Sequence, residues 1–133
     1  ISSFYSVPEL QGIPLTRRGI NDSFWVVTGT TREHELSCDI EKAARSNATV
    51  VILMGMHKLE EICQVFIDQG KEGLPVAIIQ NGSRPNERIV MGEVVNLVQV
   101  SKKNNMGAPA ILVFGEVVRL HPDYLLDYIS RNK

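Results

Sequence analysis

The sequence has few of the residues that mark disulfide-bonded or metal-binding proteins. It contains two cysteines in 133 residues, Cys38 and Cys63, and they lack the close spacing of a Cys-x-x-Cys pair. Disulfide scaffolds and zinc sites use more cysteines at shorter spacing. We therefore expect both thiols to be free in a reducing compartment, which points to the cytoplasm. The histidines His34, His57 and His121 are too far apart in sequence for a ligand motif, so no metal site is expected.

The chain also lacks an excess of charge and a long apolar run. Its net charge is −1, which gives no electrostatic reason to expect nucleic acid or an anionic membrane as a partner. The longest strongly apolar run, residues 50–56, is far shorter than the ~20 residues that cross a bilayer. No charged segment followed by an apolar one opens the chain, as it would in a signal peptide. Residues 1–20 lack an initiator methionine and read like the middle of a protein, so we expect a fragment of a longer chain.

What is present is the composition of one globular domain. Hydrophobic residues make up 44% and charged residues 22%, and 133 residues are enough to bury a core. Apolar and β-branched segments predict five strands, at residues 23–29, 49–55, 74–82, 87–95 and 109–120. The second is apolar almost throughout, as in a strand buried on both faces. Turn-forming residues between the third and fourth strands predict a hairpin at 81–86.

Helical periodicity is clearest between the second and third strands. The apolar residues that share the spacing are Leu59, Ile62, Cys63, Phe66 and Ile67. Gly70 is placed to end this helix. We also expect a short helix with Asp39 as its N-cap, a weak helix over 96–104 and a final helix over 121–129. Strands alternating with helices predict an α/β fold, with about five strands in a mixed sheet flanked by helices.

Three predicted strands end in turns that contain glycine, at residues 27–29, 53–55 and 80–82. In α/β sheets, ligands collect at the carboxyl ends of strands, where glycine lets the backbone come close. Met54 and Met56 lie at the second of these turns. Two explanations are open: the methionines fill gaps in the core, or a thioether packs against an aromatic ring such as adenine.

Arginine occurs as an adjacent pair, Arg17 and Arg18, in a loop rich in glycine and proline. Such a pair can bind carboxylates or phosphates bidentately, or can simply be solvated. The chain has no phosphate-binding Gly-x-x-x-x-Gly-Lys loop, no Gly-x-Ser-x-Gly turn and no Gly-x-Gly-x-x-Gly turn. The residues alone therefore predict a ligand face without naming its ligand.

Four blocks of the chain carry a family resemblance: GIPLTRRGINDSFWVVTG, TVVILMGMHKL, PVAIIQNGSRPNERIVMGEV and PAILVFGEVVRL. The resemblance extends over residues 1 to about 120, and these four blocks make it specific. In this order they resemble the C-terminal half of the uroporphyrinogen-III C-methyltransferases, which belong to the tetrapyrrole methylase superfamily. The first block is the most diagnostic, since the family typically reads Gly-Ile-Pro-Leu-Thr-His-Arg-Gly there. Gly-Glu-Val-Val at 115–118 favours these members over methylases of later corrin precursors.

The resemblance implies the C-terminal α/β domain of a two-domain enzyme whose active site lies between its domains. Residues 1–20 would form an interdomain or cleft loop and residues 21–133 the C-terminal domain, with the N-terminal domain outside this chain. The implied reaction transfers methyl groups from S-adenosylmethionine to uroporphyrinogen III, giving precorrin-2 for siroheme and cobalamin synthesis. A homodimer is also implied. A methylase of a later corrin precursor and a non-catalytic S-adenosylmethionine-binding module are the alternative hypotheses.

The resemblance also implies site residues. By position, Ser2, Ser3, Met54 and Gly82 would contact S-adenosylmethionine, and Arg18 would hold an acetate or propionate of the tetrapyrrole substrate. No catalytic residue is expected in this chain, because the family's glycine-rich cofactor loop and its proposed acid and base residues belong to the N-terminal domain.

The chain departs from the family pattern at three positions near these residues. Arg17 stands where a histidine is usual, Leu53 where a tyrosine is usual, and Gln80 where an acidic residue is common. Leu53 lacks a hydroxyl that could meet the substrate, so this change bears on the substrate contact more than on the cofactor contact.

Overall fold

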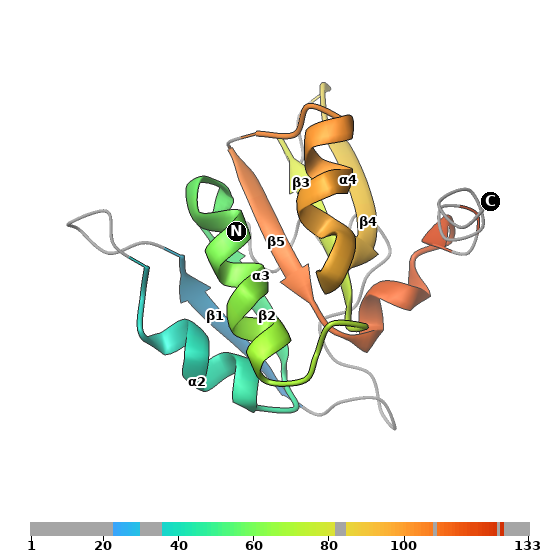
Figure 1. Ribbon diagram of the computed structural model, residues 1–133. Coiled ribbons are helices and arrows are strands. Elements are labelled where there is room, and N and C mark those ends of the chain that lie inside the picture. The colour runs from blue at the N-terminus through green and yellow to red at the C-terminus, as the bar shows by residue number, and fades with distance from the viewer. Residues whose placement is uncertain (1–22, 30–35, 82–84, 108, 125, 127–133) are drawn as a thin grey trace.

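A five-stranded mixed sheet forms the centre of the protein (Figure 1). The computed structural model describes residues 23–29, 36–81, 85–107, 109–124 and 126. The strands are β1 (Phe24–Thr28), β2 (Thr49–Leu53), β3 (Pro75–Gln80), β4 (Arg88–Glu93) and β5 (Ala110–Phe114), in the spatial order β1-β2-β5-β3-β4. β1 and β2 are parallel, and the other neighbouring pairs are antiparallel. β1, β2 and β3 therefore run in one direction and end at the same side of the sheet, which we call the carboxyl edge.

The central strands are buried on both faces, as their continuous apolar sequence predicts. In β2, Val50, Val51 and Ile52 are each at most 1% exposed. β3 and β4 form the predicted antiparallel hairpin, in which Val76 faces Gly92. The mixed α/β fold expected from the sequence is confirmed.

Three α-helices cover one face of this sheet, as Figure 1 shows: α2 (Asp39–Arg45), α3 (Leu59–Asp68) and α4 (Leu97–Lys103). Short 3-10 turns, η1 (Met56–Lys58) and η2 (Val94–Asn96), lead into α3 and α4. On α3 the buried residues are Leu59, Ile62, Cys63 and Phe66, which are four of the five predicted from the periodicity. Amphipathic spacing thus correctly predicted the helix face that packs on the sheet.

The end of α3 follows the sequence prediction closely. Gly70 lies just past the C-cap residue with φ 76°, a left-handed backbone that glycine adopts without steric cost. Its N–H donates to the carbonyl of Ile67 (2.9 Å), and the N–H of Lys71 donates to that of Phe66 (3.0 Å). This pair of hydrogen bonds is the Schellman motif, which satisfies carbonyls at a helix end.

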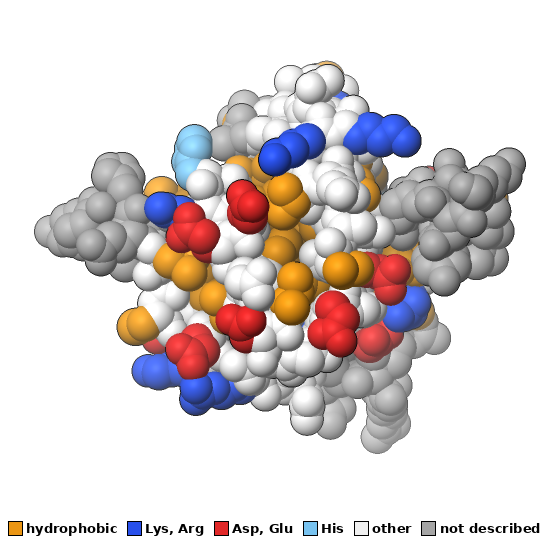
Figure 2. Space-filling model, in the orientation of Figure 1, with side chains coloured by type: hydrophobic (Ala, Val, Ile, Leu, Met, Phe, Trp, Pro, Cys, Tyr) orange, Lys and Arg blue, Asp and Glu red, His pale blue; other side chains and the backbone are white. Residues whose placement is uncertain are grey.

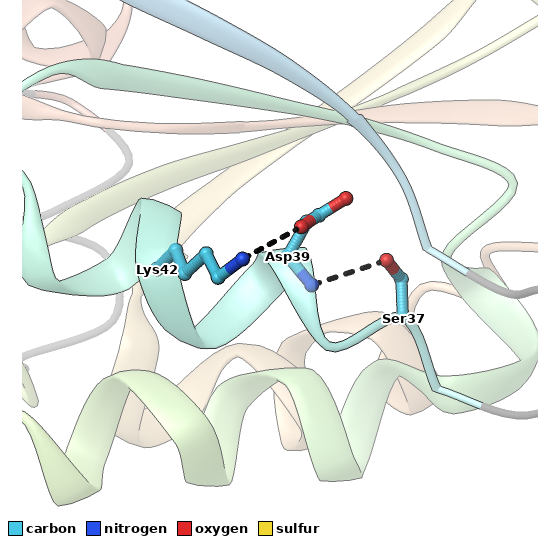
Figure 3. A network of polar contacts seen from close by, with 3 residues as sticks. All are labelled: Ser37, Asp39 and Lys42. Atoms are coloured by element: carbon cyan, nitrogen blue, oxygen red, sulfur yellow. Dashed lines mark hydrogen bonds and ion pairs between the residues drawn. The ribbon is translucent and has the colours of Figure 1, made fainter.

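The start of α2 differs from the prediction by one residue. The N-cap residue is Cys38, and Asp39 is the first residue of the helix (Figure 3). The hydroxyl of Ser37 accepts a hydrogen bond from the N–H of Asp39 (3.3 Å), while the Asp39 carboxylate lies 3.7 Å from the Lys42 ammonium. Asp39 is therefore an acidic residue in the first turn, where its negative charge interacts favourably with the helix dipole.

The opposite face of the sheet packs against η3 (Glu116–Leu120) and Tyr124. The predicted strand 109–120 is thus wrong in its second half, since β5 ends at Phe114. The neighbours of β5 explain this result. β2 begins at Thr49 and β3 at Pro75, and the N–H of Gly115 makes the last bond, to the carbonyl of Pro75 (2.9 Å). Beyond that point an extended chain would leave its backbone groups unpaired.

The final helix predicted over 121–129 is described at its beginning. The ring Nδ1 of His121 accepts a hydrogen bond from the N–H of Asp123 (3.0 Å), and the His121 carbonyl accepts one from the N–H of Tyr124 (3.0 Å). Pro122 lies at the start of this predicted helix, where the missing N–H of proline costs nothing. Residues 127–129 lie outside the described residues.

The helix-covered face carries charges of both signs among exposed apolar side chains (Figure 2). Its ion pairs include Arg45–Glu41 and Lys58–Glu61, which join residues three or four positions apart on one helix side. Such exposed pairs contribute about 0–1 kcal/mol each. In the part of the chain that the structure describes, no helix is both long and apolar enough to cross a bilayer.

Candidate functional site

The carboxyl edge brings together the ends of the three strands that the sequence singled out. Thr28 and Leu53 are register partners at the ends of β1 and β2. The N–H of Gly29 donates to the carbonyl of Leu53 (2.6 Å), and the N–H of Asn81 donates to that of Pro109 (3.0 Å). One strand, β5, separates β2 from β3. The carboxyl ends of β2 and β3 therefore lie about 10 Å apart. The three strand ends singled out in the sequence therefore lie at one edge of the sheet.

Met54 stands out at this edge by its exposure and its backbone. Its side chain is 68% exposed, and its φ is 57°. A left-handed backbone costs a residue with a side chain about 1–2 kcal/mol, and such strain gathers at functional sites. Met56, by contrast, is half-buried and packs against the helix-side core. Of the two explanations for these methionines, core filling therefore applies to Met56 and is excluded for Met54.

Gly29 and Gly55 hold the two parallel strand ends in close contact. A Cβ on Gly29 would lie 2.7 Å from the Cα of Gly55, and a Cβ on Gly55 would lie 2.8 Å from Cγ2 of Ile52. Both distances are shorter than real contacts of a Cβ allow. At Gly29, the absence of a side chain therefore lets the backbone at the end of β1 lie against the backbone of Gly55. This contact fixes where the peptide before Gly55 sits, and so the position of Met54.

The end of β3 shows a second left-handed residue, Asn81, with φ 54°. The Asn-Gly dipeptide at 81–82 is a sequence signal for this backbone as well as for the turn predicted at 81–86. Gln80, the last residue of β3, accepts a hydrogen bond through Oε1 from the N–H of Gly107 (3.1 Å). No local sequence pattern predicts this contact, because the two residues are 27 positions apart.

Of the predicted site residues, Met54 is the one that lies within the described ranges. Ser2, Ser3, Arg18 and Gly82 lie outside the described residues. The structure therefore places Met54 on the exposed carboxyl edge and leaves the other assignments as predictions.

Two of the hollows among the described residues lie at opposite ends of the strands. One of about 240 Å³ opens between the start of α3 and the end of α4, next to Met54 in the chain; it is lined by Met56, His57, Leu59, Glu60, Val98, Ser101, Lys102 and Met106. A larger one, of about 510 Å³, lies at the opposite edge, beside Thr49 and Gly115. There the ammonium of Lys71 donates to the carbonyl of Ser46 (2.5 Å), and burial lowers the Lys71 pKa. Strand direction favours the carboxyl edge as the ligand face, despite the larger volume opposite.

The described residues are better suited to binding than to covalent or metal chemistry. Burial raises the pKa of the Cys63 thiol to about 12, so this thiol stays protonated at neutral pH and is no nucleophile. Within the described ranges, no group of three or more His, Cys, Asp or Glu side chains is placed to hold a metal ion. What the edge offers is an exposed thioether and backbone groups in fixed positions.

Comparisons with known proteins show which family this chain resembles. The family profile of the Tetrapyrrole (Corrin/Porphyrin) Methylases matches residues 1–97. A uroporphyrinogen-III C-methyltransferase of Methanocaldococcus jannaschii is 37% identical over 122 residues, which are 90% of this chain and 50% of the relative. A siroheme synthase of Psychrobacter arcticus is 35% identical over 92% of this chain and 23% of its own length. The chain thus spans half or less of the length of these relatives.

Solved structures agree with the sequence comparison. The crystal structure of uroporphyrin-III C-methyl transferase from Thermus thermophilus, complexed with S-adenyl homocysteine, aligns with a TM-score of 0.72 at 30% identity. The alignment covers 82% of this chain and 48% of that one. Most of this fold is therefore shared with that enzyme, whose crystal structure is of a complex with S-adenyl homocysteine.

Proposed function

Because the chain belongs to the tetrapyrrole methylases, we propose that it is the C-terminal half of an S-adenosylmethionine-dependent methyltransferase that converts uroporphyrinogen III to precorrin-2. Residues 21–133 would be its C-terminal domain and residues 1–20 the loop that faces the cleft between domains. The product would feed siroheme and cobalamin synthesis.

The observation that carries this proposal is the exposed, strained Met54 at the carboxyl edge. A methionine that is 68% exposed gains little from burial, and its φ of 57° costs free energy. Contact with an adenine ring would use its polarizable thioether and explain why this residue type stands there. In the sequence Gly82 follows Asn81, the residue after β3, and we assign Gly82, with Ser2 and Ser3, to the same cofactor.

Fewer residues of this chain are assigned to the substrate than to the cofactor. We assign Arg18 to a carboxylate of the tetrapyrrole, because guanidinium binds carboxylates bidentately. Leu53 presents no hydroxyl at the edge, so a polar contact to the substrate must come from elsewhere in the protein. The acid and base groups would come from the N-terminal domain.

The chain's contribution to the reaction is binding and orientation. S-adenosylmethionine supplies a methyl group on a sulfonium, which an electron-rich pyrrole carbon can attack. Met54 and the backbone beside Asn81 would fix the cofactor against the sheet edge, and Arg18 would align the substrate. Such alignment, together with exclusion of water from the closed cleft, lowers the barrier without a covalent intermediate on the protein.

We also propose that the protein works as a homodimer in the cytoplasm. A reducing compartment fits a chain whose two cysteines, exposed Cys38 and buried Cys63, are both free thiols. Leu126, within the final helix predicted over 121–129, is 66% exposed, and association of two copies would give this apolar side chain a partner.

The role of Met54 can be separated from protein stability. We expect Met54→Gly to weaken S-adenosylhomocysteine binding by about two- to tenfold, because the thioether contact is lost. The same change should leave the free energy of unfolding unchanged or raise it by up to about 1 kcal/mol, because glycine relieves the strain at φ 57°. Calorimetric titration of the native protein and urea unfolding measure the two effects.

Met56→Leu is the matched control, since Met56 packs on the core and the change conserves its volume. It should keep the affinity of the unsubstituted protein. Cofactor binding that is equally tight in Met54→Gly would refute the assignment of Met54.

A further inference from the structure

The end of β3 is tied to the connection between α4 and β5 by two hydrogen bonds that cross between the segments. The Gln80 side chain accepts from the N–H of Gly107 (3.1 Å), and the Pro109 carbonyl accepts from the N–H of Asn81 (3.0 Å). The two bonds run in opposite directions, one donated by Gly107 to Gln80 and the other donated by Asn81 to Pro109. Together they close a ring that includes the Gln80–Asn81 peptide.

The other end of this connection is fixed as well. α4 ends in a Schellman motif, in which Asn105 takes the left-handed position (φ 53°) and the N–H of Met106 donates to the carbonyl of Ser101 (3.0 Å). The guanidinium of Arg88 on β4 donates to the carbonyl of Asn104 (2.6 Å). Gly107 is therefore presented to Gln80 by a segment that is itself anchored to the hairpin.

This arrangement bears on the backbone of Asn81. A left-handed backbone in a residue other than glycine persists when its surroundings determine it, since it costs free energy in isolation. The surroundings here are the bond that the Asn81 N–H donates to Pro109 and, one residue earlier, the bond that Gln80 accepts from the Gly107 N–H. A carboxamide at position 80 holds the end of β3 through its oxygen, independently of any charge.

We propose that Gln80 is a positioning residue for the cofactor face: its side-chain oxygen holds the α4–β5 connection against β3 and so fixes the backbone of Asn81 at the carboxyl edge. This inference rests on the proposed function, because that function supplies the ligand that the backbone of Asn81 would contact. Gln80 itself contacts no ligand in this account.

The test compares Gln80→Ala with Gln80→Glu in the native protein that contains these residues. Alanine removes the oxygen acceptor, whereas glutamate keeps one in the same place, and a charged acceptor still binds an N–H well. We expect Gln80→Ala to weaken S-adenosylhomocysteine binding by roughly two- to tenfold, as expected for loss of one hydrogen bond. Gln80→Glu should stay within about twofold of the unsubstituted protein. The control is Gln64→Ala, on the exposed side of α3, where Gln64 bonds to Asp68.

Two further readouts distinguish positioning from a general loss of stability. In Gln80→Ala, the KM for S-adenosylmethionine should rise while the KM for the tetrapyrrole is unchanged. Hydrogen exchange at the Gly107 amide should become faster in Gln80→Ala and stay slow in Gln80→Glu.

Each outcome decides the proposal. Affinity of Gln80→Ala equal to that of the unsubstituted protein overturns it, as does Gln80→Glu binding as weakly as Gln80→Ala. If the unsubstituted protein binds no S-adenosylhomocysteine, the proposed function fails and the positioning role fails with it. Slow exchange at Gly107 would then still show that the hydrogen bond exists as a structural contact alone.

Discussion

Replacing Gly29 with valine is expected to destabilise the protein by about 3 kcal/mol and to weaken S-adenosylhomocysteine binding by more than about tenfold. The reason is steric. A Cβ at position 29 would lie 2.7 Å from the Cα of Gly55 and 3.0 Å from the carbonyl oxygen of Met54. Backbone cannot rotate away as a side chain can, so the end of β1 must separate from the end of β2. That movement displaces Met54, the residue we assign to the cofactor.

Thermal or urea unfolding and calorimetric titration measure the two parts of this result. Gly73→Val is the matched control, because a Cβ at Gly73 meets nothing closer than Glu93 Oε2 at 3.8 Å. It should change the free energy of unfolding by no more than about 0.5 kcal/mol. A Gly29→Val protein with unchanged stability would contradict the close approach of the two strand ends.

The second large effect is expected in the core beneath α3. Phe66 and Phe114 are both fully buried, and their rings stack with centroids 4.2 Å apart and planes 8° from parallel. Phe66→Ala removes this contact and leaves a cavity between α3 and β5, so we expect the free energy of unfolding to fall by about 3–5 kcal/mol. Urea unfolding of the native protein measures the loss.

The control for this substitution is Val95→Ala, at a side chain that is 62% exposed. Truncation there should cost at most about 0.5 kcal/mol. A loss below about 2 kcal/mol for Phe66→Ala would mean that the site collapses around the missing ring or that the stacked pair does not form.

The sequence predicted best where one local pattern determines the structure. The spacing of Leu59, Ile62, Cys63 and Phe66 predicted the buried face of α3, and Gly70 predicted its end. The apolar run at 49–55 predicted a central strand. In each case the deciding physics, amphipathic burial or a left-handed C-terminal residue, acts within a few positions of the chain.

Prediction failed where the deciding contact lies far away in sequence. Val117 and Val118 have the composition of a strand, but β5 ends at Phe114 because its neighbours β2 and β3 begin at that level. The hydrogen bond from Gly107 to Gln80 is equally invisible to local patterns. β-propensity describes a residue's fit to a sheet and does not supply the partner strand.

At the candidate site, local sequence patterns do not distinguish two methionines that the structure places differently. Composition treats Met54 and Met56 alike, and periodicity does not separate them. The structure does, because the turn after β2 exposes Met54 and returns Met56 to the core. The family resemblance assigned Met54 to the cofactor, and the geometry supplies a physical reason why a methionine there is available to bind.

The measurement that tests the central claim most directly is methyl transfer by the native protein that contains this chain. It would be incubated with uroporphyrinogen III and S-adenosylmethionine, and the mass of the tetrapyrrole product would be read. The account predicts a gain of two methyl groups, and a smaller yield at limiting S-adenosylmethionine when Met54 is replaced by glycine. An unchanged tetrapyrrole mass in a protein that still binds S-adenosylhomocysteine would contradict the assigned reaction and leave the carboxyl edge as a cofactor-binding face for another substrate.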